Sequence, residues 1–187
     1  MGSSHEIFRK AKVGAAAGVI GGIAIIASLF GIDFYIGAAP GTFYMMIGVA
    51  VGLHGMPAIV FGFIANMLTA ATIGTVFCVC STLHRILNLT SLRKAIFAGG
   101  VTGLEVYAIF FMPITLFLMV PSIDSTIVSS GGAIIQEQAT ASVLKANLVA
   151  IMWGALALHV FYGSVMGVFC GMMLYEDYRS PTKKIDK

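Results

Sequence analysis

The basic residues of this chain are confined to three short clusters, and long stretches almost free of charged side chains separate the clusters. Ten of the eleven Lys and Arg residues lie within 9–12, 85–94 and 179–187, and Lys145 is the exception. A charged side chain at mid-bilayer costs roughly 2.5–3.5 kcal/mol even on a mild insertion scale. The apolar stretches can therefore lie in lipid, whereas the clusters must flank it. The pattern predicts an integral membrane protein.

Four stretches are long enough to cross a bilayer as a helix, which takes about 20 residues. We place these spans at 13–32, 57–83, 95–120 and 146–175. The uncharged run 34–84 could hold two spans, but Gly and Pro residues interrupt its first half. We therefore expect a short helix near 43–53 that lies in the interface or re-enters the membrane. The predicted fold is an all-α integral membrane protein with four transmembrane helices, forming a single transmembrane domain over residues 1–187.

The basic clusters also predict an orientation. Short cytoplasmic loops of membrane proteins are enriched in Lys and Arg. With four crossings, the N terminus, the 84–94 loop and the tail 177–187 lie on the cytoplasmic side of the plasma membrane. Asp33 and the polar loop 121–144 then lie outside. A short surface helix is expected near 133–139 of that loop.

The two halves of the sequence resemble each other. Arg-Lys-Ala precedes both the first and the third span, at 9–11 and 93–95. In the second and fourth spans, a constant offset of 93 aligns Asn66, Ala70, Gly74 and Cys78 with His159, Gly163, Gly167 and Gly171. We interpret this as a duplicated two-helix unit, with repeats at about 9–84 and 93–176. The alternative is that small residues are common in all membrane helices.

Small residues spaced four apart form ladders on the spans. They are Gly14, Gly18 and Gly22; Gly99 and Gly103; and Gly163, Gly167 and Gly171. This spacing puts the residues on one helix face, where two backbones can approach closely. The ladders predict tight helix packing, either inside the chain or against a partner protein.

Three polar residues are expected near the middle of the bilayer. Glu105 lies about 16 Å beyond Lys94 at 1.5 Å per residue, and His159 lies about 24 Å from the same side, counted from Tyr175. Both are near the middle third of the bilayer, with Asn66 at similar depth. Ionisable groups in a membrane usually face a protein interior, where they pair or line a path. Glu105 and His159 could therefore form a proton or solute site, or a structural polar clamp.

The remaining candidate chemistry is sparse. The odd count of three cysteines argues against a closed disulfide framework, and their expected place near the cytoplasm favours reduced thiols. The four His residues are scattered, and Cys78 and Cys80 point to nearly opposite faces of a helix. We therefore expect no metal site, no cofactor and no catalytic residue. The flanking clusters account for the net charge of +3, so no nucleic-acid partner is expected.

Three segments carry a resemblance to a known group of proteins. They are Gly-Phe-Ile-Ala-Asn-Met-Leu-Thr at 62–69 with Gly74, Ser-Leu-Arg-Lys-Ala at 91–95 through Pro113, and Leu-His-Val-Phe-Tyr-Gly at 158–163 with Gly167. Over about 10–175 the chain resembles small, functionally uncharacterised four-helix membrane proteins of bacteria and archaea. Asn66 departs from the pattern, because a His there would complete the symmetry with His159. Some archaeal proteins of this size resemble accessory subunits of larger assemblies such as ammonia monooxygenase.

These observations leave three functional hypotheses. The first is a non-catalytic accessory or structural subunit of a multi-subunit membrane complex, whose partners are the lipid bilayer and other membrane subunits. It is favoured by the glycine ladders and by the charged tail, which could dock on a partner. The second is a small oligomeric transporter or channel that uses Glu105 and His159. The third, a small membrane enzyme using the same two residues, is the least favoured.

Overall fold

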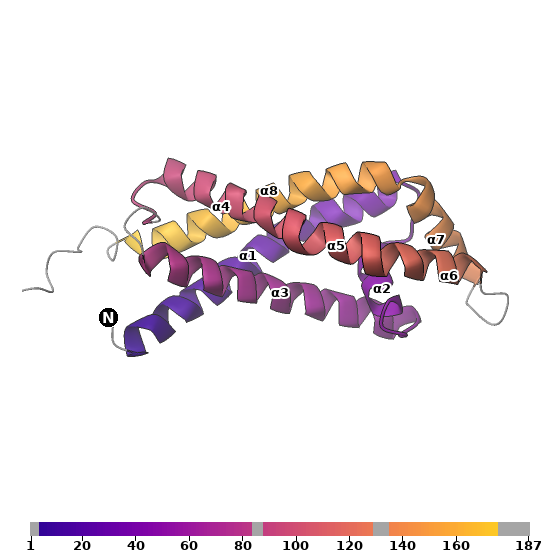
Figure 1. Cartoon of the computed structure of the whole chain (residues 1–187), viewed down its shortest axis with the longest axis horizontal. Helices are drawn as coiled ribbons and strands as arrows, with labels where there is room; N and C mark the ends of the chain where they lie inside the picture. Colours follow the sequence, from indigo (N-terminus) through magenta and orange to yellow (C-terminus); the bar gives the residue numbers. More distant parts are fainter. Residues whose placement is uncertain (1–3, 84–87, 129–134, 176–187) are drawn as a thin grey trace, which may run out of the picture. The chain divides into compact units, whose positions relative to one another are not determined.

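Every regular element of the described residues, which are 4–83, 88–128 and 135–175, is helical in the computed structural model (Figure 1). Four helices are long and apolar enough to cross a membrane: α1 (Ser4–Tyr35), α3 (Gly55–Leu83), the continuous run from α4 (Leu92–Val106) to α6 (Val120–Val128), and α8 (Leu148–Met173). Two shorter helices, α2 (Thr42–Val49) and α7 (Ile135–Ala146), lie between them in the sequence. The predicted all-α class with four spans is confirmed, and the chain is a multi-pass membrane protein. The tail 177–187 lies outside the described residues.

The third span differs most from its prediction. Its helix continues to Val128, beyond the expected end at residue 120. Two π-helical turns, η2 (Tyr107–Phe111) and η3 (Thr115–Met119), flank the short helix α5 (Met112–Ile114) that contains Pro113. Proline has no backbone N–H and its ring crowds the preceding turn, so the ordinary α-helical bonding cannot pass through it unchanged. Wider π turns accommodate such an interruption without ending the helix.

The predicted outer loop 121–144 is largely helical rather than irregular. Its first part forms α6, where the Ser122 hydroxyl donates a hydrogen bond to the Leu118 carbonyl at 2.8 Å. Such back-bonding lets a polar residue sit within a helix. The expected surface helix is present as α7 and is longer than predicted. Lys145 at the end of α7 forms an exposed ion pair with Asp124 of α6 at 2.7 Å.

The described residues group into two compact units. Within the described ranges, the first unit draws on residues 4–24, 67–83, 88–104 and 159–175, and the second on 25–66, 105–128 and 135–158. Each unit takes helical segments from both halves of the sequence. The predicted duplication and single domain therefore stay predictions, and each unit is described by itself below.

The first unit contains parts of α1, α3, α4 and α8. Leu89, Met166 and Leu174 are among its fully buried side chains. The Tyr162 hydroxyl of α8 donates a hydrogen bond to the Ala70 carbonyl of α3 at 2.9 Å. That bond satisfies the polar tip of a buried aromatic side chain, so the phenol can lie between the helices.

The second unit has an apolar core that combines α2 and α7 with parts of α3 and the third span. Its buried members are Met45, Met46, Ala58, Met119, Ile123, Ala141 and Leu144. Gly48 and Gly62 let α2 approach α3 closely, because a Cβ at either position would collide with backbone atoms of Ala58 or Tyr44. An eight-residue helix rises only about 12 Å, so α2 cannot itself cross the membrane.

Asp33 holds the start of α2. Its carboxylate accepts the Gly41 N–H at 2.9 Å, immediately before the first residue of α2. Asp33 is only 3% exposed, so it does not face the outer solvent as a simple loop residue would. The first N–H groups of a helix have no partner within the helix, and an acceptor placed there satisfies them. An eight-residue helix has little stability by itself, so the hydrogen bond from Gly41 to Asp33 is important for the structure.

We predict that Asp33→Ala destabilises the protein by about 1–3 kcal/mol, because it leaves the buried Gly41 N–H without its acceptor. Thermal unfolding in a mild detergent measures the effect. Asp33→Asn, which keeps an acceptor oxygen, should be milder. Asp124→Ala is the matched control, since its exposed ion pair contributes about 0–1 kcal/mol. Equal melting temperatures for Asp33→Ala and Asp124→Ala would show that the cap is dispensable.

Candidate functional site

Glu105 is the acidic residue predicted to lie deep in a span, and its side chain is exposed on α4. It lies about 16 Å along the helix from Lys94 at 1.5 Å per residue. Within the described ranges, no hydrogen bond or ion pair reaches Glu105. The predicted pairing of Glu105 with His159 stays a prediction, as does the role of this pair in a proton or solute site.

His159 is half-buried where α8 meets α4 in the first unit. Its carbonyl oxygen lies so close to Gly103 that any Cβ added there would collide with it. The position of His159 is therefore fixed by the packing of backbone against backbone.

Asn66 is half-buried in the second unit, beside Tyr44 of α2. The Tyr44 side chain is 2% exposed, and its hydroxyl has no well-formed hydrogen bond within the described part of the chain. Burial raises the pKa of the Tyr44 phenol above 10.0, and the Asn66 amide partly offsets that rise. The Tyr44 phenol is therefore neutral at physiological pH.

One seam of small residues joins α1 to α3 in the first unit. A Cβ added at Gly14 would collide with the Gly74 carbonyl, and one added at Gly18 would collide with the Ala70 carbonyl. Gly22, one turn further along, packs on the Met67 side chain. The helices touch backbone to backbone at these positions, which is the close approach that small residues allow in lipid.

A second seam joins α4 to α8 in the same unit. Gly99 and Gly103 of α4 lie against Gly163, Gly167 and the His159 carbonyl of α8, and Gly171 packs on the Ala95 side chain. Each predicted packing glycine thus faces another helix of its own unit. The ladders are occupied inside the chain, so they do not form free faces for a partner protein.

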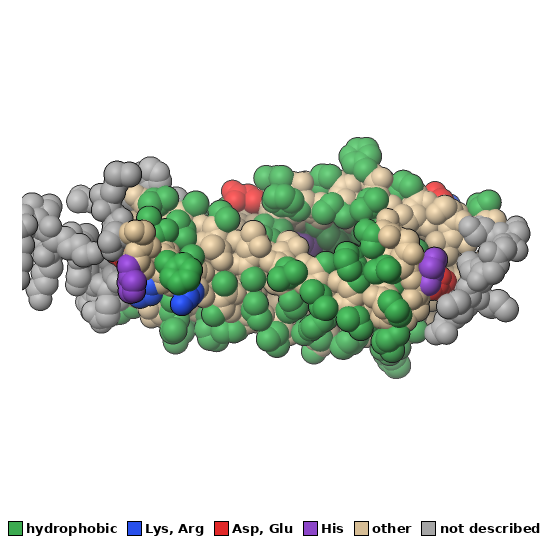
Figure 2. Space-filling view, turned by 90° about the horizontal axis from the view of Figure 1, so that it is seen from below, with side chains coloured by type: hydrophobic (Ala, Val, Ile, Leu, Met, Phe, Trp, Pro, Cys, Tyr) green, Lys and Arg blue, Asp and Glu red, His purple; other side chains and the backbone are tan. Residues whose placement is uncertain are grey.

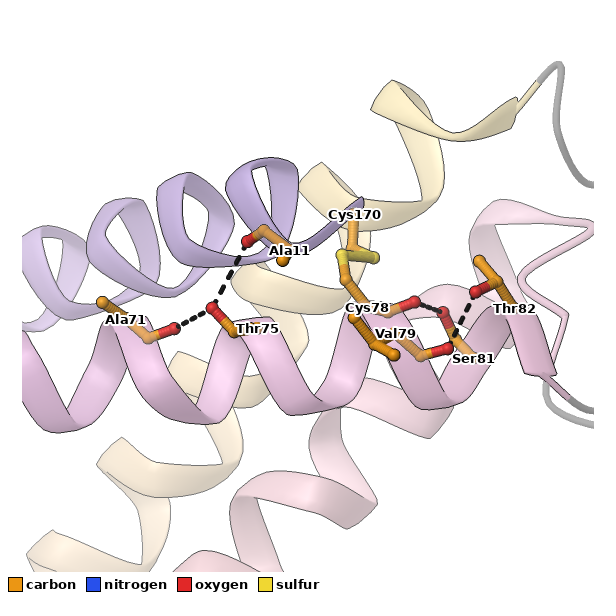
Figure 3. Close-up of a disulfide and its surroundings, with 8 residues drawn as sticks. All are labelled: Ala11, Ala71, Thr75, Cys78, Val79, Ser81, Thr82 and Cys170. Carbon is orange, nitrogen blue, oxygen red and sulfur yellow. Dashed lines mark hydrogen bonds between the residues drawn. A yellow bond between two sulfur atoms is a disulfide. The ribbon is translucent and has the colours of Figure 1, made fainter. Parts of the chain in front are cut away.

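Cys78 of α3 and Cys170 of α8 form a disulfide in the first unit (Figure 3). The expectation of reduced thiols and no disulfide is therefore wrong for these two residues. Their Cα atoms are 6.1 Å apart, within the range that a disulfide spans, and both side chains are fully buried. The third cysteine, Cys80, is free and exposed, as its spacing from Cys78 on a helix requires.

The hydroxyl groups near the disulfide bond to nearby carbonyls. Thr75 Oγ1 lies 2.8 Å from the Ala71 carbonyl in its own helix and 3.3 Å from the Ala11 carbonyl of α1 (Figure 3). One hydroxyl proton serves one of these acceptors at a time. Ser81 likewise bonds back to the Cys78 carbonyl at 2.9 Å. These groups are internally satisfied rather than arranged around a ligand.

Glu137 of α7 makes structural contacts that the sequence did not reveal. It is 2% exposed, and one carboxylate oxygen accepts the Gly55 N–H at the start of α3 at 3.0 Å. The other oxygen lies 3.0 Å from His54 Nδ1. This clasp ties α7 to the α2–α3 connection in the second unit. A hydrophilic segment around residue 137 was visible in the sequence, but no local signal linked it to residues more than eighty positions earlier.

Among the described residues, no group of three or more His, Cys, Asp or Glu side chains could hold a metal ion. Comparison with protein-family models, with curated proteins and with solved structures finds no match.

We predict one alkylated cysteine per chain when the protein is unfolded in detergent without reductant, and three after reduction. Intact-mass measurement after treatment with a thiol reagent gives the count. Cys80→Ser should leave no reactive thiol in the unreduced protein. Three alkyl groups without reductant in freshly extracted protein would contradict the Cys78–Cys170 pairing.

We predict that Gly163→Ala destabilises the first unit by about 1–3 kcal/mol, because even one methyl group collides with the Gly99 backbone. Gly163→Leu should be at least as harmful. The control is Gly154→Ala in the same helix, where the new Cβ would lie 3.5 Å from the Ile32 side chain and meet no backbone. Thermal unfolding in detergent compares the three variants. An unchanged melting temperature for Gly163→Ala would contradict the close backbone contact between Gly163 of α8 and Gly99 of α4.

Proposed function

We propose that this chain is a non-catalytic structural or accessory subunit of a multi-subunit membrane complex. The observation that carries the proposal is the exposed Glu105 within a membrane-spanning helix. A carboxylate facing hydrocarbon costs several kcal/mol unless another group satisfies it. No such group lies among the described residues of this chain, so a neighbouring protein is the natural source.

The surroundings of Glu105 support a protein neighbour. Leu104, Ile109 and Phe110 of the same span are exposed. Many apolar side chains, drawn in green, also reach the surface of the face in view in Figure 2. An apolar surface with one acidic group fits a partner helix that supplies a hydrogen-bond donor at the same depth. Interhelical bonds of this kind add roughly 0.6–2 kcal/mol to association within a membrane.

The glycine ladders pack helices of this chain against one another, so they are not evidence for contact with a partner protein. They pack within the chain, so the predicted contacts with a partner shift to the Glu105 face and the other exposed apolar side chains. The predicted docking of the tail falls on residues outside the described part of the chain.

We place the subunit in the plasma membrane with both termini in the cytoplasm. The confinement of ten basic residues to three clusters supports this orientation. An archaeal complex such as ammonia monooxygenase is the assembly that we suggest, because some archaeal multi-pass proteins of this size resemble accessory subunits; no residue motif of this chain specifies it. A disulfide near the cytoplasmic side is unusual, but intracellular proteins of hyperthermophilic archaea and bacteria are rich in disulfides.

A duplicated two-helix unit is the architecture that we infer. The α1–α3 contacts of Gly14 with Gly74 and of Gly18 with Ala70 have counterparts between α4 and α8. Moving the first helix by 85 positions, one more than the offset of 84 that aligns the two Arg-Lys-Ala motifs, and the second by 93 gives Gly99 with Gly167 and Gly103 with Gly163. The two seams are related both in sequence and in their contacts, which supports duplication over a chance richness in glycine.

A small oligomeric transporter or channel is the alternative. The same exposed Glu105 favours it, because a carboxylate on the surface of one copy could line a path between copies, together with His159. Two-helix repeats are small for a complete path, so this function would also need an oligomer.

We predict that Glu105→Leu reduces the yield of the native complex about fivefold or more, because a partner's buried donor loses its acceptor. Glu105→Gln should retain most of the yield, since the amide still accepts a hydrogen bond. Leu104→Ala is the control, because it changes an exposed side chain of the same surface and leaves the Glu105 carboxylate in place. Isolation from native membranes in mild detergent, followed by identification of the co-purifying proteins, provides the measurement.

A different result distinguishes transport. A stable assembly of this chain alone that moves a solute across liposomes, and stops doing so in Glu105→Gln, would overturn the accessory-subunit proposal.

A further inference from the structure

The Cys78–Cys170 disulfide lies where three helices of the first unit meet. Cys78 belongs to α3 and Cys170 to α8 (Figure 3). The third helix is α1, because the Cβ that Gly14 lacks would lie only 2.8 Å from the Cβ of Cys78. Both cysteine side chains are fully buried. The proposed function does not use this bond or its cover.

The face of α8 that carries Cys170 also packs on α1. Tyr162, Met166 and Cys170 are spaced four residues apart, and all three are buried. Residues at this spacing lie on one side of a helix. The Cβ that Gly21 of α1 lacks would lie 2.9 Å from the Tyr162 ring. The helix α1 therefore contacts both of the helices that the disulfide links.

The contacts that hold α1 on α3 beside the disulfide are non-covalent. A Cβ added at Gly14 would collide with backbone atoms of Gly74 and Thr75, so the two helices touch directly. The Thr75 hydroxyl lies 3.3 Å from the Ala11 carbonyl of α1, which is the longer of its two contacts (Figure 3). Contacts of this kind can open locally without unfolding of the whole protein.

Reduction of a disulfide needs direct access to a sulfur atom. A thiolate of a dithiol reductant attacks one sulfur and forms a mixed disulfide, and the second thiol of the reductant then displaces the remaining cysteine. Two electrons and two protons pass to Cys78 and Cys170, which become thiols, while the dithiol becomes a cyclic disulfide. Because the bond is buried beside α1, this attack requires a movement of the helix.

We propose that α1 acts as a gate over the Cys78–Cys170 disulfide. While α1 packs on α3 at Gly14, a thiol reductant cannot reach the bond, and α3 stays linked to α8. Displacement of α1 opens the bond to reduction, and the covalent link between the α1–α3 and α4–α8 pairs is then lost. The gate depends only on contacts inside the first unit, so it does not rest on the proposed accessory role.

The test follows reduction of the full chain in a mild detergent by dithiothreitol, a small dithiol. Samples are alkylated at intervals, and the alkyl groups are counted by intact mass. The count should rise from one to three per chain. The rate should be about one hundredth or less of the rate for the chain unfolded in sodium dodecyl sulfate, because only the locally opened fraction reacts.

Two variants loosen the gate, and a third is the control. Gly14→Ala should speed reduction of the folded protein about tenfold, because the added methyl group pushes α1 away from Cys78. Thr75→Val removes the hydroxyl near Ala11 without adding bulk and should speed reduction to a smaller extent. Gly31→Ala in the same helix should keep the wild-type rate, since its Cβ would meet no atom within 4 Å.

The outcomes separate a gate from general shielding by detergent. Equal reduction rates for the folded and the unfolded wild type would overturn the proposal. An unchanged rate in Thr75→Val, and in Gly14→Ala where that variant folds, would overturn it as well, because the micelle and not α1 would then protect the bond. Equal acceleration in Gly31→Ala would also contradict the gate, since any change in α1 would then have the same effect.

Discussion

Backbone-to-backbone contact through glycine is the interaction on which the first unit depends. Helices in lipid gain no hydrophobic driving force from meeting each other, so close packing and hydrogen bonds must hold them together. The α1–α3 and α4–α8 seams supply that packing. The two helix pairs are then joined by the Cys78–Cys170 disulfide and by the hydrogen bond from Tyr162 to Ala70. Both links need helices that are already close, so they reinforce the packing and do not replace it.

In the second unit, hydrogen bonds from buried carboxylates help to hold the helices together. Asp33 accepts the Gly41 N–H just before α2, and Glu137 accepts the Gly55 N–H at the start of α3. A buried charge is tolerated when hydrogen bonds satisfy it, and a helix N-terminus favours a negative group. These two acids fix the short helices α2 and α7 against the long ones. Their role is therefore architectural.

The sequence predicts the spans well because span length and charge exclusion are local properties. It predicts a helix near α2 for the same reason, and it identifies the glycines by their spacing. It could not predict the Cys78–Cys170 pair, since the odd cysteine count misled and the residues are 92 positions apart. The bonds of Asp33 and Glu137 were hidden as well, because they depend on how distant segments meet. The extension of the third helix to Val128 was missed because Ser and Asp suggest a loop until their hydrogen bonds are known.

The contrast between the acidic residues gives the strongest argument about function. Asp33 and Glu137 are buried and bonded to backbone N–H groups, and Asp124 pairs with Lys145 near a helix end. The chain therefore has the means to satisfy its carboxylates internally. Glu105 lies on an apolar span without such a bond among the described residues. Because an unsatisfied carboxylate in hydrocarbon is costly, its position makes physical sense when another protein surface supplies the missing donor.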